Sequence, residues 1–220
     1  MIYFAMIKTA ALFHRSNIKF NVFIMIGLSL ISQSNYADTN SVSSILENRH
    51  KNVIIQQWDL SCGAATLATL LNFQHGDYVT EKEVANALMN RPEYINNPQL
   101  VNIRQGFSLF DLKRYVEARG YKGIGYGKLS FEDLLAKAPI IVPINVFGYN
   151  HFVVFRGMLG NRVLLADPAW GNKTLLAEEF EDLRIDFPQI GKVGFVVARN
   201  DDLTPPNQLI PNSNEFFMTR

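Results

Sequence analysis

The hydrophobic periodicity of this 220-residue chain changes near residue 120, and this change constrains the fold more than any other feature. Before it, apolar residues recur at helical spacing. After it, short segments rich in β-branched and aromatic residues are separated by Gly, Asn and Pro, a pattern typical of an antiparallel sheet. The predicted strands are 140–146, 151–156, 162–166 and 192–199. Helices followed by strands favour an α+β fold over an alternating fold with a parallel sheet.

The predicted helices differ in character. The segment 62–73 is apolar almost all round, which indicates a central helix buried within the domain. Three further helices each follow a Thr or Ser that can cap the first turn. These helices are 81–90, 109–119 and 131–137. The stretch 91–105 is rich in Pro and Asn and is predicted to be a loop, whereas residues 52–55 are predicted to form a short strand.

Residues 1–37 have the layout of a secretory signal peptide. Basic residues without any acidic residue precede the apolar run 20–31, which is shorter than the roughly 20 residues of a membrane-spanning helix. Cleavage after Ala37 or after Ser34 and a start at Met6 are open alternatives, and a retained anchor is the less favoured reading. We therefore expect an exported protein, periplasmic or extracellular, with no stable membrane anchor after processing.

The residues that follow the signal peptide suit one domain, expected over residues 38–200. A polar tail that is extended or loosely ordered is expected over residues 201–220. The formal net charge is +1, and Lys and Arg are scattered instead of forming a basic stripe. This distribution lacks the electrostatic footprint of a nucleic-acid-binding protein. We expect a monomer that binds no nucleic acid.

Cys62 is the only cysteine of the chain and stands at the expected start of the buried helix. An exported protein with one cysteine forms no internal disulfide, so a free thiol needs another use. The unpaired N–H groups and the positive dipole end at a helix start favour a thiolate. We predict that Cys62 is a nucleophile, and the alternative is a buried, inert cysteine.

The predicted sheet offers a partner for this thiol. His151 begins one strand and Asp167 follows another, with turn residues 157–161 between the two strands. A hairpin centred near Leu159 would place His151 directly opposite Asp167, close enough for an imidazole–carboxylate hydrogen bond. The alternative is a buried strand histidine that bonds to a backbone carbonyl. The other histidines are expected to be solvated and not catalytic: His14, His50 and His75.

These groups together predict a Cys–His–Asp catalytic site. Cys62 would attack a carbonyl carbon, His151 would transfer the proton, and Asp167 would orient the imidazole. The developing oxyanion needs N–H donors, which the backbone of Cys62 and a side-chain amide can supply. Gln56 and Gln57 both lie on the segment that enters the helix, so either can supply this amide.

Three motifs occur in order along the chain. They are Gln56 followed by Cys62-Gly63-Ala64-Ala65, then Asn150-His151-Phe152-Val153-Val154, then Ala166-Asp167-Pro168-Ala169 with Gly171. Together they resemble the bacteriocin-processing, double-glycine peptidases, cysteine peptidase family 39 of the papain-like superfamily. The resemblance implies a papain-like α+β fold, with an N-terminal helical half around the buried central helix and a C-terminal antiparallel sheet. It also implies no metal and no cofactor, and it selects Gln56 over Gln57 as the oxyanion donor.

Many members of that family are cytoplasmic domains of peptide-exporting ATP-binding transporters, whereas this sequence shows an export signal and neither a transmembrane array nor a phosphate-binding loop. It therefore resembles the stand-alone, exported branch, which serves secretion or surface-fibre systems. The resemblance implies a polypeptide substrate, such as an exported protein or leader peptide, and a cut after Gly-Gly. Two alternatives stay open. One is a non-catalytic module that holds such substrates, and the other is a thiol amidase or acyltransferase with the same triad.

Overall fold

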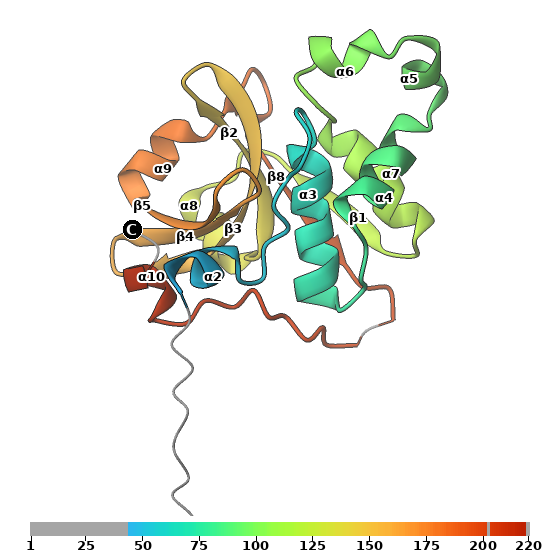
Figure 1. Cartoon of the computed structure of the whole chain (residues 1–220). Helices are drawn as coiled ribbons and strands as arrows, with labels where there is room; N and C mark the ends of the chain where they lie inside the picture. Colours follow the sequence, from blue (N-terminus) through green and yellow to red (C-terminus); the bar gives the residue numbers. More distant parts are fainter. Residues whose placement is uncertain (1–43, 202, 219–220) are drawn as a thin grey trace, which may run out of the picture. The chain divides into compact units, whose positions relative to one another are not determined.

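The computed structural model describes residues 44–201 and 203–218, and the predicted signal peptide lies outside these residues. Helices fill the first part and most strands the second (Figure 1). The helices are α2 (Ile45–His50), α3 (Cys62–Thr69) with its π-helical continuation η1 (Leu70–His75), α4 (Glu81–Met89), α5 (Pro92–Asn96), α6 (Gln99–Ile103), α7 (Leu109–Ala118), α8 (Phe131–Ala136), α9 (Ala177–Leu183) and α10 (Glu215–Met218). Across residues 44–201 and 203–218, no helix combines the length and the apolar character needed to cross a membrane.

Side-chain caps begin three helices where the sequence predicts them. At the start of α7, the Ser108 hydroxyl accepts the backbone N–H of Asp111, and the Asp111 carboxylate accepts the backbone N–H of Ser108. The same reciprocal arrangement begins α4 at Thr80 and α8 at Ser130. Each cap satisfies N–H groups that the first turn leaves unpaired and contributes about 1 kcal/mol.

Two predictions for the first half of the chain are wrong. The stretch 91–105, predicted to be a loop, contains α5 and α6. Pro92 lies in the first turn of α5, where its missing N–H removes no helical hydrogen bond, so the Pro-rich composition does not exclude a helix. Residues 52–55 form no strand. The backbone N–H of Ile54 donates instead to the hydroxyl of Thr69 in α3.

The main sheet has six strands in the order β1-β8-β2-β3-β4-β5, all paired antiparallel. The strands are β1 (Lys122–Tyr126), β2 (Ile140–Val146), β3 (Tyr149–Leu159), β4 (Arg162–Asp167), β5 (Gly171–Leu176), the separate pair β6 (Asp186–Phe187) and β7 (Gly191–Lys192), and β8 (Gly194–Ala198). The four predicted strands correspond to β2, β3, β4 and β8. The edge strands β1 and β5 carry Gly and polar residues that hide the strand pattern.

The β3–β4 hairpin has a different register from the predicted one. Leu159 pairs with Arg162 across a two-residue turn, so the centre of the hairpin lies after Leu159. His151 therefore does not lie directly opposite Asp167, and the predicted cross-strand pair is wrong. The residue opposite His151 is Ile144 on its other neighbour, β2.

A β-bulge in β3 nevertheless keeps the two side chains on one face. The pairing of β3 with β4 shifts by one residue at Arg156. Beyond this shift Val154 pairs with Ala166, so the next residue of β4, Asp167, faces the same side of the sheet as His151. The two residues are diagonal neighbours.

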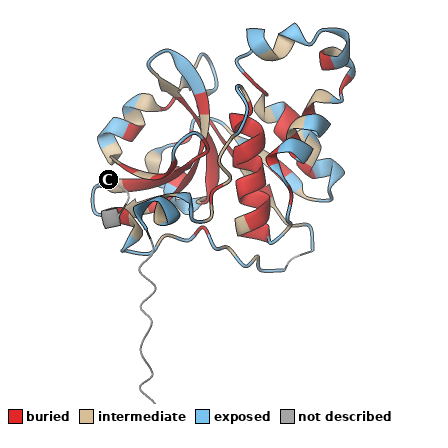
Figure 2. Cartoon of the chain, viewed as in Figure 1, coloured by how far each residue is buried: buried red, intermediate tan, exposed pale blue. Residues whose placement is uncertain are grey.

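Helix α3 lies between the sheet and the helices α4 and α7 (Figure 1). All of its residues are buried, as expected for the predicted central helix (Figure 2). One apolar cluster joins α3 to one face of the sheet, and it includes Leu67, Leu112 and Val154. A second cluster covers the opposite face and includes Phe155 and Phe180. Each large apolar side chain buried in this way contributes about 1.5–3 kcal/mol, so the position of α3 is firmly fixed.

The C-terminal segment packs on the domain, which differs from the loosely ordered tail expected over residues 201–220. Leu209 is completely buried. The Arg156 side chain donates to the Leu209 carbonyl and forms an ion pair with Glu215 in α10. The backbone N–H groups of Asn207 and Gln208 also donate to the carbonyls of Gln74 and Phe73, and the polar, Pro-rich composition does not reveal such backbone contacts.

Candidate active site

Cys62 is the first residue of α3, carries a free thiol and is 1% exposed. The first backbone hydrogen bond of the helix runs from Ala65 to the Ser61 carbonyl, so the N–H of Cys62 precedes the helical ladder. The Ser61 hydroxyl does not cap the helix but bonds to the Trp58 carbonyl and to the Glu81 carboxylate. These contacts fix the loop that leads into Cys62.

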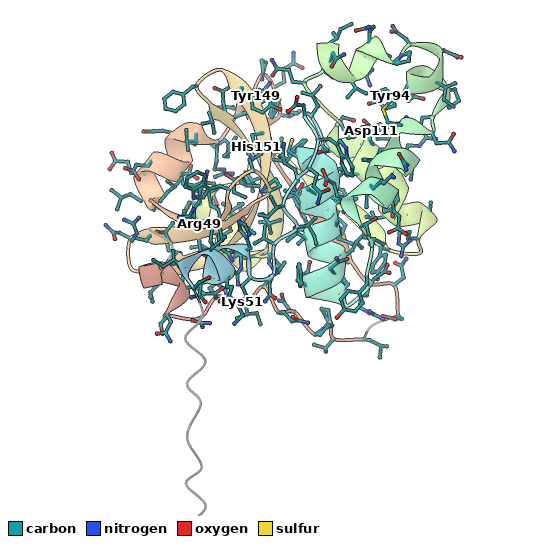
Figure 3. All side chains as sticks on the ribbon, viewed as in Figure 1. Arg49, Lys51, Tyr94, Asp111, Tyr149 and His151 are labelled. Carbon is teal, nitrogen blue, oxygen red and sulfur yellow. The ribbon has the colours of Figure 1, made fainter. Side chains whose placement is uncertain are left out.

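His151 lies on β3 beside the end of α3 that carries Cys62 (Figure 3 labels His151 and Tyr149). Its Nε2 atom lies 2.7 Å from Oδ1 of Asp167, and both side chains are buried. Cys62 begins the helix that packs against this strand: a Cβ atom on its neighbour Gly63 would lie 3.4 Å from Cδ2 of Phe152, the neighbour of His151. The three residues predicted to act together therefore meet at one place.

Burial and the two partners act in opposite directions on the pKa of His151. Burial lowers it, whereas the hydrogen bonds and the negative charges of Asp167 and Cys62 raise it. The net effect raises the pKa of His151 from 6.5 to about 9. The imidazole therefore holds its proton at neutral pH, which is the state required beside a thiolate.

Asp167 has further partners besides the imidazole. Its Oδ1 atom accepts the backbone N–H of Ala169 at 2.9 Å, and its Oδ2 atom forms an ion pair with Nζ of Lys173 at 2.5 Å. Burial raises the pKa of Asp167, but the hydrogen bonds and positive charges of His151 and Lys173 outweigh it and lower this pKa to about 2. The carboxylate stays ionised, and both of its oxygens are held in place.

Gln56 and Gln57 occupy different environments. Gln56 is half-buried and lines a cavity together with His151, and its backbone N–H donates to the carbonyl of Pro168 at 2.8 Å. Gln57 is exposed, and its backbone N–H donates to the carboxylate of Glu81. The structure therefore brings Gln56 to the site and leaves the Gln57 side chain in solvent.

Two cavities flank the imidazole. The larger, of about 520 Å³, has a mainly apolar lining that includes Phe107, Phe152, Phe187 and Ile190. The other, of about 440 Å³, is lined by Gln56, Val146, Tyr149, Asp167, Ala169, Trp170 and Lys173. His151 lines both cavities, so a chain that runs from one to the other passes the imidazole.

This arrangement of cysteine, histidine and carboxylate is that of a thiol hydrolase. A family model described as the peptidase C39 family matches residues 50–183, which include all four predicted site residues. The chain belongs to the peptidase C39 family. Members of this C39 family are cysteine peptidases, and the chain is therefore a cysteine-type peptidase.

Two curated relatives of this C39 peptidase come from Pseudomonas, and both are described as probable functional amyloid protease FapD. The protein of Pseudomonas aeruginosa is 38% identical over 170 residues, which cover 76% of this chain and 72% of the relative. The protein of Pseudomonas fluorescens is 39% identical over 140 residues, which cover 63% of this chain and 59% of the relative. Both alignments agree with the C39 assignment.

Solved C39 peptidase domains share the fold. A double glycine motif protease from an AMS/PCAT transporter, in complex with the leader peptide, aligns with a TM-score of 0.52 and 25% identity, over 67% of this chain and 91% of that chain. The peptidase domain of Streptococcus ComA aligns with a TM-score of 0.53 and 14% identity, over 69% of this chain and 100% of that chain. The predicted papain-like α+β fold is confirmed.

The other histidines of this C39 peptidase have separate environments. His50 is exposed, as expected. His75 is buried, against the prediction, because its Nε2 atom lies 3.2 Å from the Val197 carbonyl and its ring contacts Tyr121. His14 lies outside the described residues. Among the side chains that the structure describes, no group of three or more His, Cys, Asp or Glu is arranged to hold a metal ion.

Sequence reasoning missed three residues that contact the C39 site. Lys173 lies on β5, and only the unpredicted pairing of β5 with β4 would have placed it near Asp167. Glu81 looks like an ordinary first-turn acid, so no sequence signal distinguishes it. Tyr149 lies two residues before His151 on β3, and the centroids of the two rings are 6.3 Å apart.

Proposed function

We propose that this C39 peptidase is an exported enzyme that cleaves a peptide bond in another secreted polypeptide. The observation that carries the proposal is the position of His151, which bonds to Asp167 and lies beside the start of the buried helix that Cys62 begins. The basic and then apolar segment over residues 1–37 supports export.

The proposed reaction begins with a thiolate–imidazolium pair. The Cys62 sulfur attacks the carbonyl carbon of the substrate, and His151 donates its proton to the leaving amine as the C–N bond breaks. The product of this half-reaction is a thioester on Cys62. Water then attacks the thioester while His151 accepts its proton, which releases the new carboxyl end and restores the thiolate.

Two donors stabilise the oxyanion in the proposed mechanism. One is the backbone N–H of Cys62, which precedes the helical ladder. The other is the side-chain amide of Gln56, a residue that lines a cavity beside His151; its Nε2 atom donates one hydrogen to the Trp58 carbonyl at 3.3 Å and has a second to give. Nε2 of His151 is hydrogen-bonded to the Asp167 carboxylate, so Nδ1 is the ring nitrogen that exchanges a proton with the Cys62 sulfur. Lys173 holds the second oxygen of Asp167 and keeps the carboxylate in this orientation.

The proposed substrate is an extended peptide that crosses the imidazole between the two cavities. The larger cavity, with its apolar lining, suits the apolar side chains of a leader segment. A cut after Gly-Gly is supported by the similar solved structure, which is described as a double glycine motif protease in complex with the leader peptide. The two Pseudomonas relatives, described as functional amyloid proteases, support a substrate from a secreted fibre system.

The proposal can be tested with the purified protein under reducing conditions. A synthetic peptide with an apolar segment before a single Gly-Gly is incubated with the enzyme, and the products are identified by mass spectrometry. We expect one cut after Gly-Gly, no cut in a matched peptide with Ala-Ala, and no cut with Cys62→Ala. An intact Gly-Gly peptide that the wild-type protein binds but does not cleave would contradict the proposal and favour a substrate-holding module.

A further inference from the structure

A regular β3–β4 hairpin would separate the two catalytic side chains. Near its turn the hairpin has a regular register. If that register continued, Asp167 would pair with Val154, and its carboxylate would point to the face opposite that of His151. The bulge at Arg156 adds one residue to β3, which returns the Asp167 side chain to the same face as that of His151. The catalytic pair therefore depends on the bulge.

The side chain of the bulged residue is held by other parts of the chain. Arg156 is 2% exposed. Its Nε atom donates to the Leu209 carbonyl at 2.9 Å, and its Nη1 atom donates to Oδ1 of Asn172 at 2.7 Å and to Oε1 of Glu215 at 2.8 Å. A buried guanidinium without such partners is strongly destabilising, so these contacts favour the backbone conformation that brings Arg156 to them.

The C-terminal segment, residues 203–218, contacts the bulge directly. A Cβ atom on Gly157 would lie 2.9 Å from Cγ of Pro211, so β3 and the C-terminal segment touch beside Arg156. Helix α10 of this segment contacts α2 and β4, and Figure 1 shows α10 and α2 side by side. Asn172, which accepts from Arg156, also donates to the carbonyl of Lys51 just after α2. The bulge is thus held by both ends of the described chain.

We propose that Arg156 is a positioning residue for catalysis, held by the C-terminal segment so that the bulge keeps His151 and Asp167 on one face. This inference rests on the proposed function, because it concerns the same catalytic pair. Arg156 lines neither of the two cavities beside the imidazole. It acts on the geometry of the pair through the register of β3. The segment that holds it follows the end of the family match at residue 183.

The test compares two arginines of the same hairpin in the full-length protein. Arg156→Met removes the contacts to the C-terminal segment. Arg162→Met is the matched control, because Arg162 on β4 donates to Thr174 of β5 and not to that segment. The readouts are kcat and KM on a fluorogenic Gly-Gly coumarylamide, the rate of Cys62 alkylation by iodoacetamide from pH 4 to pH 9, and the low-field proton resonance of the His151–Asp167 hydrogen bond. All are measured below the unfolding temperature of both variants.

We expect Arg156→Met to lose roughly 100-fold in kcat with little change in KM, because small displacements of catalytic groups have effects of this size. It should also lose the rapid alkylation at acid pH and the low-field resonance, while Arg162→Met keeps all three. Arg156→Lys, which retains a cation facing Glu215, should recover part of kcat. If Arg156→Met does not fold, Glu215→Gln replaces it, with smaller losses expected in the same readouts.

An Arg156→Met protein with the kcat, alkylation profile and resonance of Arg162→Met would overturn the inference. Failure of the proposed function has a different signature. In that case neither the wild type nor Arg162→Met cleaves the peptide. The alkylation profile and the resonance then still decide whether Arg156 positions the pair.

Discussion

His151 Nε2 and Asp167 Oδ1 lie 2.7 Å apart although the strands that carry them do not pair these two residues. The contact is diagonal and exists because β3 contains one extra residue at Arg156. Any change that slips β3 by one position would turn the two side chains to opposite faces. The hydrogen bond is therefore a sensitive measure of the hairpin register as well as part of the site.

Replacement of Cys62 by Ala should abolish peptide cleavage and leave the fold intact. Loss of a nucleophile from a catalytic unit costs on the order of 10⁶-fold in kcat. The small volume removed at the start of α3 should cost only about 1 kcal/mol in the free energy of unfolding. Activity and chemical denaturation measured on the same sample test both statements. Residual cleavage at the wild-type rate would exclude Cys62 as the nucleophile.

The neighbouring glutamines provide a matched pair of variants. Gln56→Ala should lower kcat by roughly 10²–10³-fold, because it removes one donor to the oxyanion. Gln57→Ala should have little effect, because its side chain is exposed and only its backbone N–H is bonded to Glu81. Steady-state kinetics of both variants on the same peptide decide the assignment. The reverse ranking would assign the oxyanion donor to Gln57.

The pH dependence of kcat should show a decline near pH 9 on the alkaline side. The pKa of His151 is raised from 6.5 to about 9, so the imidazolium that protonates the leaving amine is lost only as the pH rises through that value. Asp167→Asn removes one cause of the raised pKa and should move this decline to lower pH. It should also lower kcat by up to about 10⁴-fold. An alkaline limb that does not move in Asp167→Asn would contradict the pairing.

Lys173→Met should reduce stability at neutral pH more than in strong acid. The pKa of Asp167 is lowered from 3.8 to about 2, partly by Lys173, so the carboxylate stabilises the fold above about pH 4 and this contribution is lost as the pH falls through about 2. Without Lys173 the pKa moves back toward 3.8. The free energy of unfolding at pH 7 should then fall by about 1 kcal/mol, the equivalent of a shift of less than one pKa unit.

Urea denaturation of this variant at pH 7, 4 and 2 should show a difference from the wild type that narrows with acidification. Lys192→Met is the control, because Lys192 has a similar exposure and pairs with Glu181 instead. The Lys192→Met variant should leave kcat unchanged. A stability difference of Lys173→Met that is constant from pH 7 to pH 2 would show that Lys173 acts independently of Asp167 ionisation.

Helix starts can be predicted here because their signals are local. Thr80, Ser108 and Ser130 each cap the helix that follows them, and the capping box needs only four residues of sequence. Helix α5 has no such signal and depends on tertiary packing. Its Tyr94 is completely buried and donates to the Asp111 carboxylate of α7 at 2.6 Å (Figure 3). No local pattern reveals that contact.

The candidate site also combines features that the local sequence predicts with features that depend on distant contacts. Cys62, His151 and Asp167 can be predicted as site residues from residue type and motif, and the structure brings them together. Their relative placement cannot be derived from a symmetric hairpin, because a bulge at Arg156 sets the register. That bulge is held by Leu209 and Glu215, more than fifty residues later in the chain. Lys173 escaped prediction because it lies on an edge strand with a weak pattern.

The contacts of Arg156 can form only late in the synthesis of the chain. Its partners Leu209 and Glu215 are synthesised after every residue of the catalytic site. A nascent chain that has not yet reached these residues therefore lacks the contacts that hold the Arg156 side chain. If Arg156 positions His151 and Asp167 as proposed, such a chain carries the Cys62 thiol without an aligned imidazole–carboxylate pair. The proposed peptidase activity would then appear only after the C-terminal segment has been made and has packed on the sheet.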